Sequence, residues 1–228
     1  SINMKVSDIF YQYRRLVSPN ETPAAFVVPD GLRTLPVYML AFEKSRILQK
    51  ITSMTKNNLR VYNMFNLNNL PLPVLSYYLY PYIVGLHDLG DDDCEYNEIY
   101  LKYRIPKGLS ASLSSIEVGG CYLAFNGQSV ILWVHNEVNP LLLQDLFGVD
   151  AFDKLDPLID ELPILDTHIN QQVRNLIKYF GEKVLKAEFL PIKLLRFSLD
   201  EQVEFVELFV EDKAVDGPSS YGDYLSAI

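Results

Sequence analysis

The sequence is poor in the residues on which many protein chemistries depend. It has two cysteines and three histidines among 228 residues, and neither Cys94 nor Cys121 belongs to a Cys-x-x-Cys pair. A four-ligand zinc site would therefore need partners that lie far apart in the chain. Two unpaired cysteines in a chain of this length are typical of a reducing compartment such as the cytosol. A chain this long also needs no disulfide or metal to stabilise its core.

Positive charge and long apolar runs are scarce as well. Lysine and arginine number 20 against 29 acidic residues, which gives a net charge of −9. This balance argues against a nucleic acid partner and against broad adhesion to an anionic membrane. No run approaches the roughly 20 apolar residues of a membrane span. The first fifteen positions mix polar and charged residues and lack the pattern of a signal peptide.

The sequence motifs of common enzymes are missing. There is no Gly-x-Ser-x-Gly elbow, Walker loop or Gly-x-Gly-x-x-Gly fingerprint. No histidine forms a His-x-x-x-His pair or adjoins a cysteine, so we predict that none binds a metal. We expect no catalytic, cofactor-binding or metal-binding residue, and a binding or structural role in place of an enzyme. The three histidines are His87, His135 and His168.

Two pairs of neighbouring acids and one aromatic residue have both a functional and a structural interpretation. Asp200/Glu201 and Glu211/Asp212 could form a general acid/base pair, but we interpret them as solvated strand ends. Trp133, the only tryptophan, could stack on a ligand. Its apolar neighbours favour a place in the core, with Phe147 closing over it.

Two further features could contact a partner. Arg174, Lys178 and Lys183 lie near one side of an expected helix, where a solvated face is the plainer interpretation. The tyrosine-rich segment at residues 77–82 could be an interface, although internal packing explains it equally well.

The first part of the chain has helical patterns. Apolar spacing predicts helices over residues 6–17, 31–45 and 55–66. Pro36 should kink the second of these or delay its start. Pro71 and Pro73 mark the start of another helix, which Pro81 should end. We therefore expect an all-α segment over residues 1–89, followed by an acidic linker at 90–98.

After the linker the pattern changes to strands. Two β-rich runs meet at Asn126-Gly127, a strong hairpin signal because both residues tolerate positive φ. A short helix should follow, with Asn139 as N-cap, Pro140 in its first position and Gly148 in the left-handed position after its end.

Further elements complete the second domain, which we place at residues 99–228. The patterns predict an extended segment at 98–106, a helix over 167–184, strands at 191–197 and 203–212, and a final helix beginning at Ser219 or Ser220. This order predicts an α+β protein in which helices pack on a mixed sheet.

One set of motifs consists of Tyr122, Leu123, Gly127, Trp133, Val134, Leu142, Leu143, Asp145, Leu146, Phe147 and Gly148. Its order and spacing resemble the gelsolin-like part of the cargo-selecting subunit of the COPII inner coat. The C-terminal matches are Glu211, Asp212, Ser220, Tyr221, Asp223 and Leu225. The helical part matches at Leu35, Pro36, Tyr38, Lys44 and Ser45. Where the family has Arg after a Tyr-Pro pair, this chain has Tyr82, which indicates a divergent paralogue.

This resemblance implies a helical segment followed by a gelsolin-like domain. It also implies cargo selection and coat assembly in endoplasmic reticulum to Golgi transport. The implied partners are the coat's GTPase-activating subunit, its small GTPase and membrane cargo proteins. The family acts in the cytoplasm, peripherally on endoplasmic reticulum exit sites and COPII vesicles. Its zinc finger and best-known cargo pockets lie in domains that this chain lacks, so we expect a fragment and assign no cargo-binding residue.

Three other interpretations stay open. The GTPase-activating paralogue has the same two domains, although the Leu-Leu-x-Asp-Leu-Phe-Gly helix at 142–148 favours the cargo-selecting subunit. An actin-binding gelsolin relative would need tandem repeats and calcium-binding carboxylates. The third interpretation is an enzyme, which would be supported if mutation of a single polar residue abolished a measured turnover.

Overall fold

The structure, a computed structural model, describes residues 35–44 and 69–212. The chain divides into two compact units, Leu70–Phe209 and a second unit formed by Ser1–Asn69 with Val210–Ile228. In the second unit the structure describes helix α2, Leu35–Lys44. Pro36 is the second residue of α2, where its missing N–H breaks no helical hydrogen bond. The helices predicted at 6–17 and 55–66, and the one beginning at Ser219 or Ser220, lie outside the described residues.

The unit Leu70–Phe209 is built on a four-stranded sheet with the order β1-β4-β5-β6. Strands β1, β4 and β5 pair antiparallel, whereas β5 and β6 pair parallel through a connection that contains two helices. The strands are β1 (Tyr82–Gly85), β4 (Cys121–Phe125), β5 (Val130–Val134) and β6 (Ile192–Arg196). The helices are α4 (Leu72–Leu79), α5 (Pro140–Phe147), α6 (His168–Tyr179) and α7 (Val203–Val206). This arrangement confirms the α+β class.

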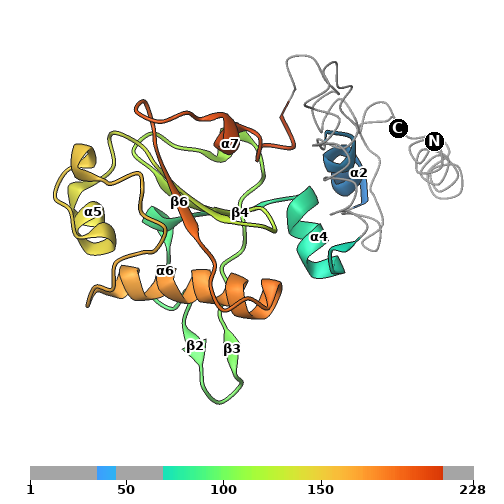
Figure 1. Cartoon of the computed structure of the whole chain (residues 1–228), viewed down its shortest axis with the longest axis horizontal. Coiled ribbons are helices and arrows are strands. Elements are labelled where there is room, and N and C mark those ends of the chain that lie inside the picture. The colour runs from blue at the N-terminus through green and yellow to red at the C-terminus, as the bar shows by residue number, and fades with distance from the viewer. Residues whose placement is uncertain (1–34, 45–68, 213–228) are drawn as a thin grey trace, which may run out of the picture. The chain divides into compact units, whose positions relative to one another are not determined.

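The local signals behave as their chemistry predicts. Helix α4 starts after Pro71 and ends before Pro81. The predicted hairpin joins β4 to β5, and Gly127 has a φ of +83°. In α5 the Asn139 side chain accepts the N–H of Leu141, and Gly148 adopts a φ of +74° after the helix. Figure 1 shows these elements in place.

Each face of the sheet packs against different helices (Figure 1). Helices α4, α5 and α6 cover one face, because alternate strand side chains such as Leu123, Leu132 and Leu194 join them in one buried cluster. A π-helical turn, Phe180–Leu185, extends α6 and places Phe180 in that cluster. The opposite face carries Trp133, which stacks on Phe205 of α7. The core therefore lies on both sides of the sheet.

The predicted strand at 203–212 is wrong. Residues 203–206 form α7, and turns follow it. The buried residues are Phe205, Leu208 and Phe209, whose i, i+3, i+4 spacing is helical. The spacing of the buried residues in this segment therefore indicates a short helix and not a strand.

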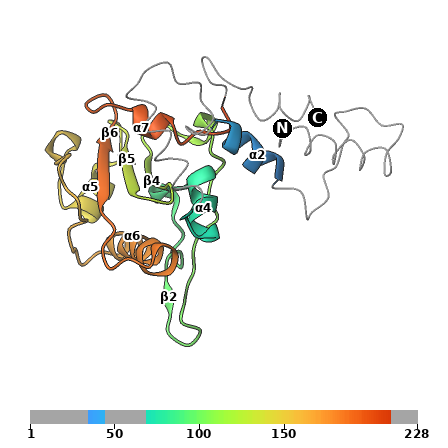
Figure 2. The same cartoon turned by 45° about the vertical axis from the view of Figure 1, so that its right-hand side comes forward.

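The extended segment predicted at 98–106 is interrupted by a turn. Strands β2 (Tyr96–Asn97) and β3 (Lys102–Tyr103) pair as a two-stranded ribbon, and residues 98–101 form its tip. Leu101 has a φ of +52°, which a continuous strand would not allow. The ribbon projects beyond α6 in both views (Figures 1 and 2).

Strand β1 precedes the acidic segment that we predicted as a linker. Residues 82–85 pair with β4, so the sheet already begins before residue 90. Cys94, within the acidic segment, is fully buried. Residues 90–98 thus lie inside the compact unit Leu70–Phe209.

Candidate functional site

Two of the three histidines have structural roles. His135 is 8% exposed, stacks on Phe197 and accepts the N–H of Glu137 through Nδ1. His168 begins α6, and its Nε2 lies 2.8 Å from the backbone oxygen of Asp91. Both rings hold backbone in place, and neither belongs to a metal-like cluster among the residues the structure describes.

Trp133 lies in the core, as the sequence predicts. Its side chain is 4% exposed, and its indole Nε1 donates to Gln202 Oε1 at 2.6 Å. The prediction that Phe147 closes over it is wrong. Phe147 belongs to the cluster on the α5–α6 face, while Trp133 points to the α7 face, because neighbouring residues of a strand alternate between faces.

The paired acids differ from their predicted role as solvated strand ends. Glu211 and Asp212 are half-buried in the turns that follow α7, where the expected strand is absent. Asp200 is not a solvated strand end, because its carboxylate accepts two hydrogen bonds from the Arg196 guanidinium, each at 2.9 Å. The two side chains are 16% and 18% exposed. These hydrogen bonds hold the pKa of Asp200 below its usual range. Glu201 is exposed, as predicted.

The tyrosine-rich segment at residues 77–82 packs internally. Tyr77 contacts the rings of Phe125 and Phe180 edge-on. Tyr82 donates its hydroxyl hydrogen to the backbone oxygen of Pro106 at 2.8 Å, and burial raises its pKa. These contacts favour the packing interpretation of this segment over the interface interpretation.

The basic side of α6 borders a groove of about 280 Å³. Arg174 donates to the amide oxygens of Asn170 and Gln171, at 2.7 and 2.9 Å. Lys178 lies 3.8 Å from Glu182, a weak exposed pair. Lys183 is exposed and does not line the groove. The groove is amphipathic, because Ile177, Phe189, Leu190, Glu161 and Glu188 line it as well.

The β2–β3 ribbon presents an apolar tip on a fixed base. Ile99, Tyr100 and Leu101 are 84%, 71% and 66% exposed. At the base, the Gln172 side chain of α6 donates to the backbone oxygens of Gly90 and Asp93, at 2.7 and 3.0 Å. An exposed apolar group on a rigid support is typical of protein contact surfaces.

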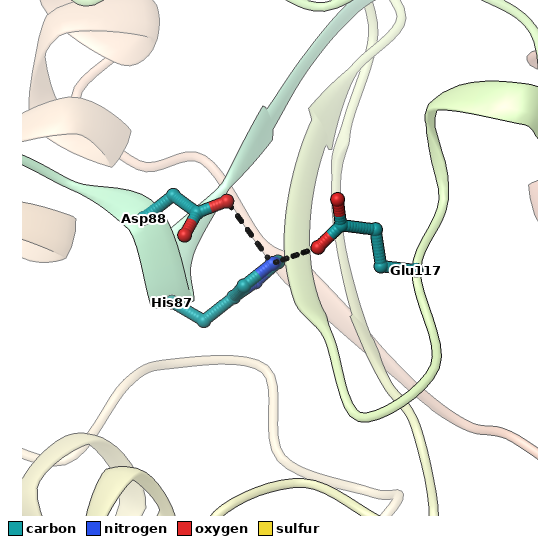
Figure 3. Close-up of side chains that lie close together, drawn as sticks. All are labelled: His87, Asp88 and Glu117. Carbon is teal, nitrogen blue, oxygen red and sulfur yellow. Dashed lines mark ion pairs between the residues drawn. The ribbon is translucent and has the colours of Figure 1, made fainter.

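A third histidine lies in a cluster that sequence reasoning missed. The His87 Nε2 atom faces carboxylate oxygens of Asp88 and Glu117 (Figure 3). His87 and Asp88 lie in a 3₁₀ turn, Leu86–Asp88, and Glu117 lies in the loop before β4. The adjacent acid was visible in the sequence, but the second acid is thirty positions away and no motif links it to His87.

Neither cysteine is available for chemistry at the surface. Cys94 and Cys121 are free thiols that are fully buried, and burial raises the pKa of each to about 12. In the described ranges, 35–44 and 69–212, no helix has the length and apolar character needed to cross a membrane.

Comparison with known proteins assigns most of the chain to two family models. The Sec23/Sec24 helical domain matches residues 1–77, and the gelsolin repeat matches residues 104–177. SED5-binding protein 3 of Saccharomyces cerevisiae is 37% identical over 237 residues, covering 98% of this chain and 25% of that protein. Protein transport protein SEC24 of Pyricularia oryzae is 32% identical over 181 residues, covering 78% of this chain and 18% of its own length.

A solved structure agrees with these matches. The human COPII-coat protein Sec24c superposes with a TM-score of 0.72 at 25% identity, over 90% of this chain and 26% of that one. The chain spans about a quarter or less of the length of these relatives. The matched order of a helical domain and a gelsolin-like domain is the one predicted from the sequence. The chain therefore belongs to the Sec23/Sec24 family, and its similarity is to the helical and gelsolin-like part of the Sec24-type members.

Proposed function

We propose that this chain acts as part of a COPII cargo-adaptor subunit in endoplasmic reticulum to Golgi transport. The observation that carries the proposal is the match to a Sec24-type relative over 98% of the chain. The superposition on a human COPII-coat protein supports it independently, because it compares backbones. The GTPase-activating paralogue and an actin-binding gelsolin module are less well supported, since the relatives named above are Sec24-type proteins.

The whole protein that contains this chain would work through protein contacts. Its proposed partners are the coat's GTPase-activating subunit, the small GTPase and membrane cargo proteins. It would lie in the cytoplasm, peripherally on exit sites of the endoplasmic reticulum, without entering the bilayer. We place the zinc finger of the whole protein outside this chain.

Two of the least exposed polar groups of the described residues have structural roles, which favours a binding role over an enzymatic one. The least exposed ion pair, Arg196–Asp200, joins the end of β6 to the turn that follows it. The buried Asn170 donates to the backbone oxygens of Leu146 and Pro163 and accepts from Leu165 N–H. Both the ion pair and Asn170 hold backbone segments in place, which gives them structural roles.

We propose that the helical domain gives way to the gelsolin-like domain between α4 and β1. The helical family model ends at residue 77, and β1 begins at Tyr82 as an edge strand of the sheet. Under this division the acidic segment at 90–98 belongs to the gelsolin-like domain, where α6 holds it.

Binding of purified coat proteins tests the proposed function. The 228-residue chain and a longer natural protein that contains it are each immobilised and offered the GTPase-activating subunit, the small GTPase and cargo tails. We expect the longer protein to retain the GTPase-activating subunit. Failure of both chains to retain any coat protein, together with calcium-dependent pelleting on actin filaments, would replace this proposal with the actin-binding one.

A matched pair of variants tests whether the ribbon tip contributes to coat binding. Ile99→Ser with Leu101→Ser removes the apolar tip, whereas Leu158→Ser with Ile164→Ser changes two residues that are 87% and 82% exposed elsewhere. If the tip contacts a coat protein, the first variant of the longer protein loses affinity and the second does not. Equal affinities for both would exclude the tip from the interface.

A further inference from the structure

Three potential ligand atoms converge beside the edge of the sheet. The His87 Nε2 atom lies 3.3 Å from Asp88 Oδ2 and 3.7 Å from Glu117 Oε2. One atom from each side chain lies within 4.8 Å of the other two. Figure 3 shows the carboxylates approaching the outer nitrogen of the ring from two sides. One imidazole and two carboxylates are a ligand set that divalent transition metals accept.

The two measured separations fit a small ion with four ligands. Zinc lies about 2.0–2.2 Å from nitrogen and carboxylate ligands, which places tetrahedral ligand atoms about 3.4 Å apart. The observed 3.3 and 3.7 Å are close to that spacing. Calcium and magnesium take oxygen ligands, so a site centred on an imidazole nitrogen fits neither.

The His87 ring is fixed by its surroundings. It packs edge-on against Tyr122 with centroids 5.0 Å apart, and its side chain is 20% exposed. A Cβ atom added to Gly85 would lie 3.0 Å from the ring, so the ring lies directly on this glycine. Because the ring cannot swing away, its Nε2 stays directed at the two carboxylates.

The inner nitrogen of the ring has two possible partners at equal distance. Nδ1 lies 3.1 Å from both the backbone oxygen and the backbone nitrogen of Cys121. If Nδ1–H donates to the oxygen, the Nε2 lone pair faces the carboxylates, as a metal ligand requires. If Nδ1 instead accepts the Cys121 N–H, Nε2 carries hydrogen and donates to Asp88. The structure accommodates both arrangements, and a bound cation selects the first.

Within residues 35–44 and 69–212, neither carboxylate is paired with a lysine or arginine. The side chains of Asp88 and Glu117 are 73% and 72% exposed. The backbone of Glu117 is nevertheless held, because its N–H donates to Tyr122 Oη at 2.7 Å and its carbonyl accepts Gly120 N–H at 3.2 Å. Two acids thus lie near one imidazole, and no lysine or arginine of the described residues pairs with them.

We propose that His87, Asp88 and Glu117 form a binding site for one divalent transition-metal ion, best fitted by Zn²⁺. A water molecule would complete the four ligands, because the carboxylates face solvent. The ion would join the 3₁₀ turn after β1 to the loop before β4 and so stabilise the folded unit, by an amount that grows with the logarithm of the free ion concentration above its Kd. This site is independent of the coat function proposed above.

Titration of the 228-residue chain with Zn²⁺ tests the site, with Co²⁺ as a spectroscopic probe. We expect one equivalent of Zn²⁺ to bind, to raise the melting temperature, and to displace Co²⁺ that absorbs in the visible range. His87→Ala, Asp88→Asn and Glu117→Gln should each weaken binding at least about tenfold. Gly85→Ala should also weaken it, by displacing the ring without removing a ligand. Asp91→Asn, in the acidic run at 90–93, should bind as the unchanged chain does.

Three results would overturn the proposal. The first is no Zn²⁺ binding below about 1 mM, which leaves a histidine paired with two acids only. The second is binding that His87→Ala does not weaken. The third is binding that Asp91→Asn weakens as strongly as Glu117→Gln, which places the ion in the acidic run. Melting curves without metal check that each variant is folded.

Discussion

Trp133 fills the core on the α7 face of the sheet and joins β5 to a segment that lies about seventy positions later in the sequence. Its ring stacks on Phe205 with centroids 4.8 Å apart and planes 7° apart, and it donates to Gln202. Gln202 in turn donates to the backbone oxygens of Arg196 and Asp200, at 3.2 and 2.6 Å. One indole ring thereby supports both α7 and the turn after β6.

Trp133→Ala should lower the free energy of unfolding by about 3–5 kcal/mol, because it opens a cavity in a packed core. Urea unfolding followed by circular dichroism measures the change. Trp133→Phe keeps most of the packing but leaves the Gln202 oxygen without its donor, so its loss should be smaller. An unchanged midpoint for Trp133→Ala would show that the ring is not part of the core.

Asp200 should make stability depend on pH. Hydrogen bonds from Arg196 lower its pKa in the folded state. Its contribution is therefore present above the unfolded pKa of about 3.9 and disappears as pH falls through the lower, folded value. At pH 7 the unchanged chain should be more stable than Asp200→Asn by about 1–3 kcal/mol. Urea unfolding at several pH values should show this difference shrinking below about pH 4, and a constant difference down to pH 3 would contradict the assignment.

At the scale of elements, the β4–β5 hairpin meets α4 at Gly127. A Cβ atom added there would lie 2.7 Å from the backbone oxygen of Val74 and 2.9 Å from the backbone nitrogen of Tyr78. Asn126 stabilises the same turn, because its side-chain oxygen accepts the N–H groups of Gln128 and Ser129. The glycine is required both by its positive φ and by the close approach of the helix backbone.

Gly127→Ala should destabilise the chain by at least about 1–3 kcal/mol, since it combines left-handed strain with a backbone clash. Gly181→Ala is the matched control, because its added Cβ would meet no atom closer than 3.5 Å. We expect the control to be neutral or slightly stabilising. Thermal denaturation of the two variants measures the difference. Equal melting temperatures for Gly127→Ala and Gly181→Ala would contradict the predicted backbone clash at Gly127.

Helix α6 fixes the ribbon through polar side chains on one face. Beside the Gln172 contacts, Asn175 Nδ2 donates to the Cys94 backbone oxygen at 3.0 Å. Gln172→Leu would remove the donor to the part-buried backbone oxygens of Gly90 and Asp93, at a cost of about 0.5–1.5 kcal/mol. Hydrogen exchange should then be faster at the amides of Cys94 and Arg104, which donate across the ribbon base to the backbone oxygens of Arg104 and Glu95. Lys178→Leu, which removes only the weak exposed ion pair with Glu182 on α6, should leave these rates unchanged.

Elements whose signals are local could be predicted from the sequence, and elements that depend on distant partners could not. Asn139, Pro140 and Gly148 determine the ends of α5 by themselves. The strand expected at 203–212 is α7 because Phe205 packs on Trp133, a contact seventy-two positions away that no local pattern reveals. The His87 cluster could not be predicted for the same reason. Its two acids lie close together only because β1 pairs with β4 and the loop before β4 is therefore near the turn after β1.

At the scale of the whole unit Leu70–Phe209, the two cysteines report on how cooperatively it unfolds. Both are fully buried in the apolar cluster on the α6 face, although Cys94 lies at the ribbon base and Cys121 in a central strand. A thiol with a pKa of about 12 has roughly one thiolate in ten thousand at pH 8. A thiol reagent should therefore modify neither cysteine until the protein opens.

The reaction of each cysteine should follow global unfolding. We expect the single-cysteine variants Cys94→Ala and Cys121→Ala to react with a thiol reagent at similar slow rates, which rise together with urea. If the ribbon base instead opens by itself, the thiol of Cys94 will react much faster than that of Cys121 in the absence of urea. Adding Gln172→Leu to both variants distinguishes the two cases further. It removes the hydrogen bond from Gln172 to the backbone oxygen of Asp93, next to Cys94, and leaves the surroundings of Cys121 unchanged. A faster reaction confined to Cys94 would then show that the contacts from α6 make the ribbon unfold together with the sheet.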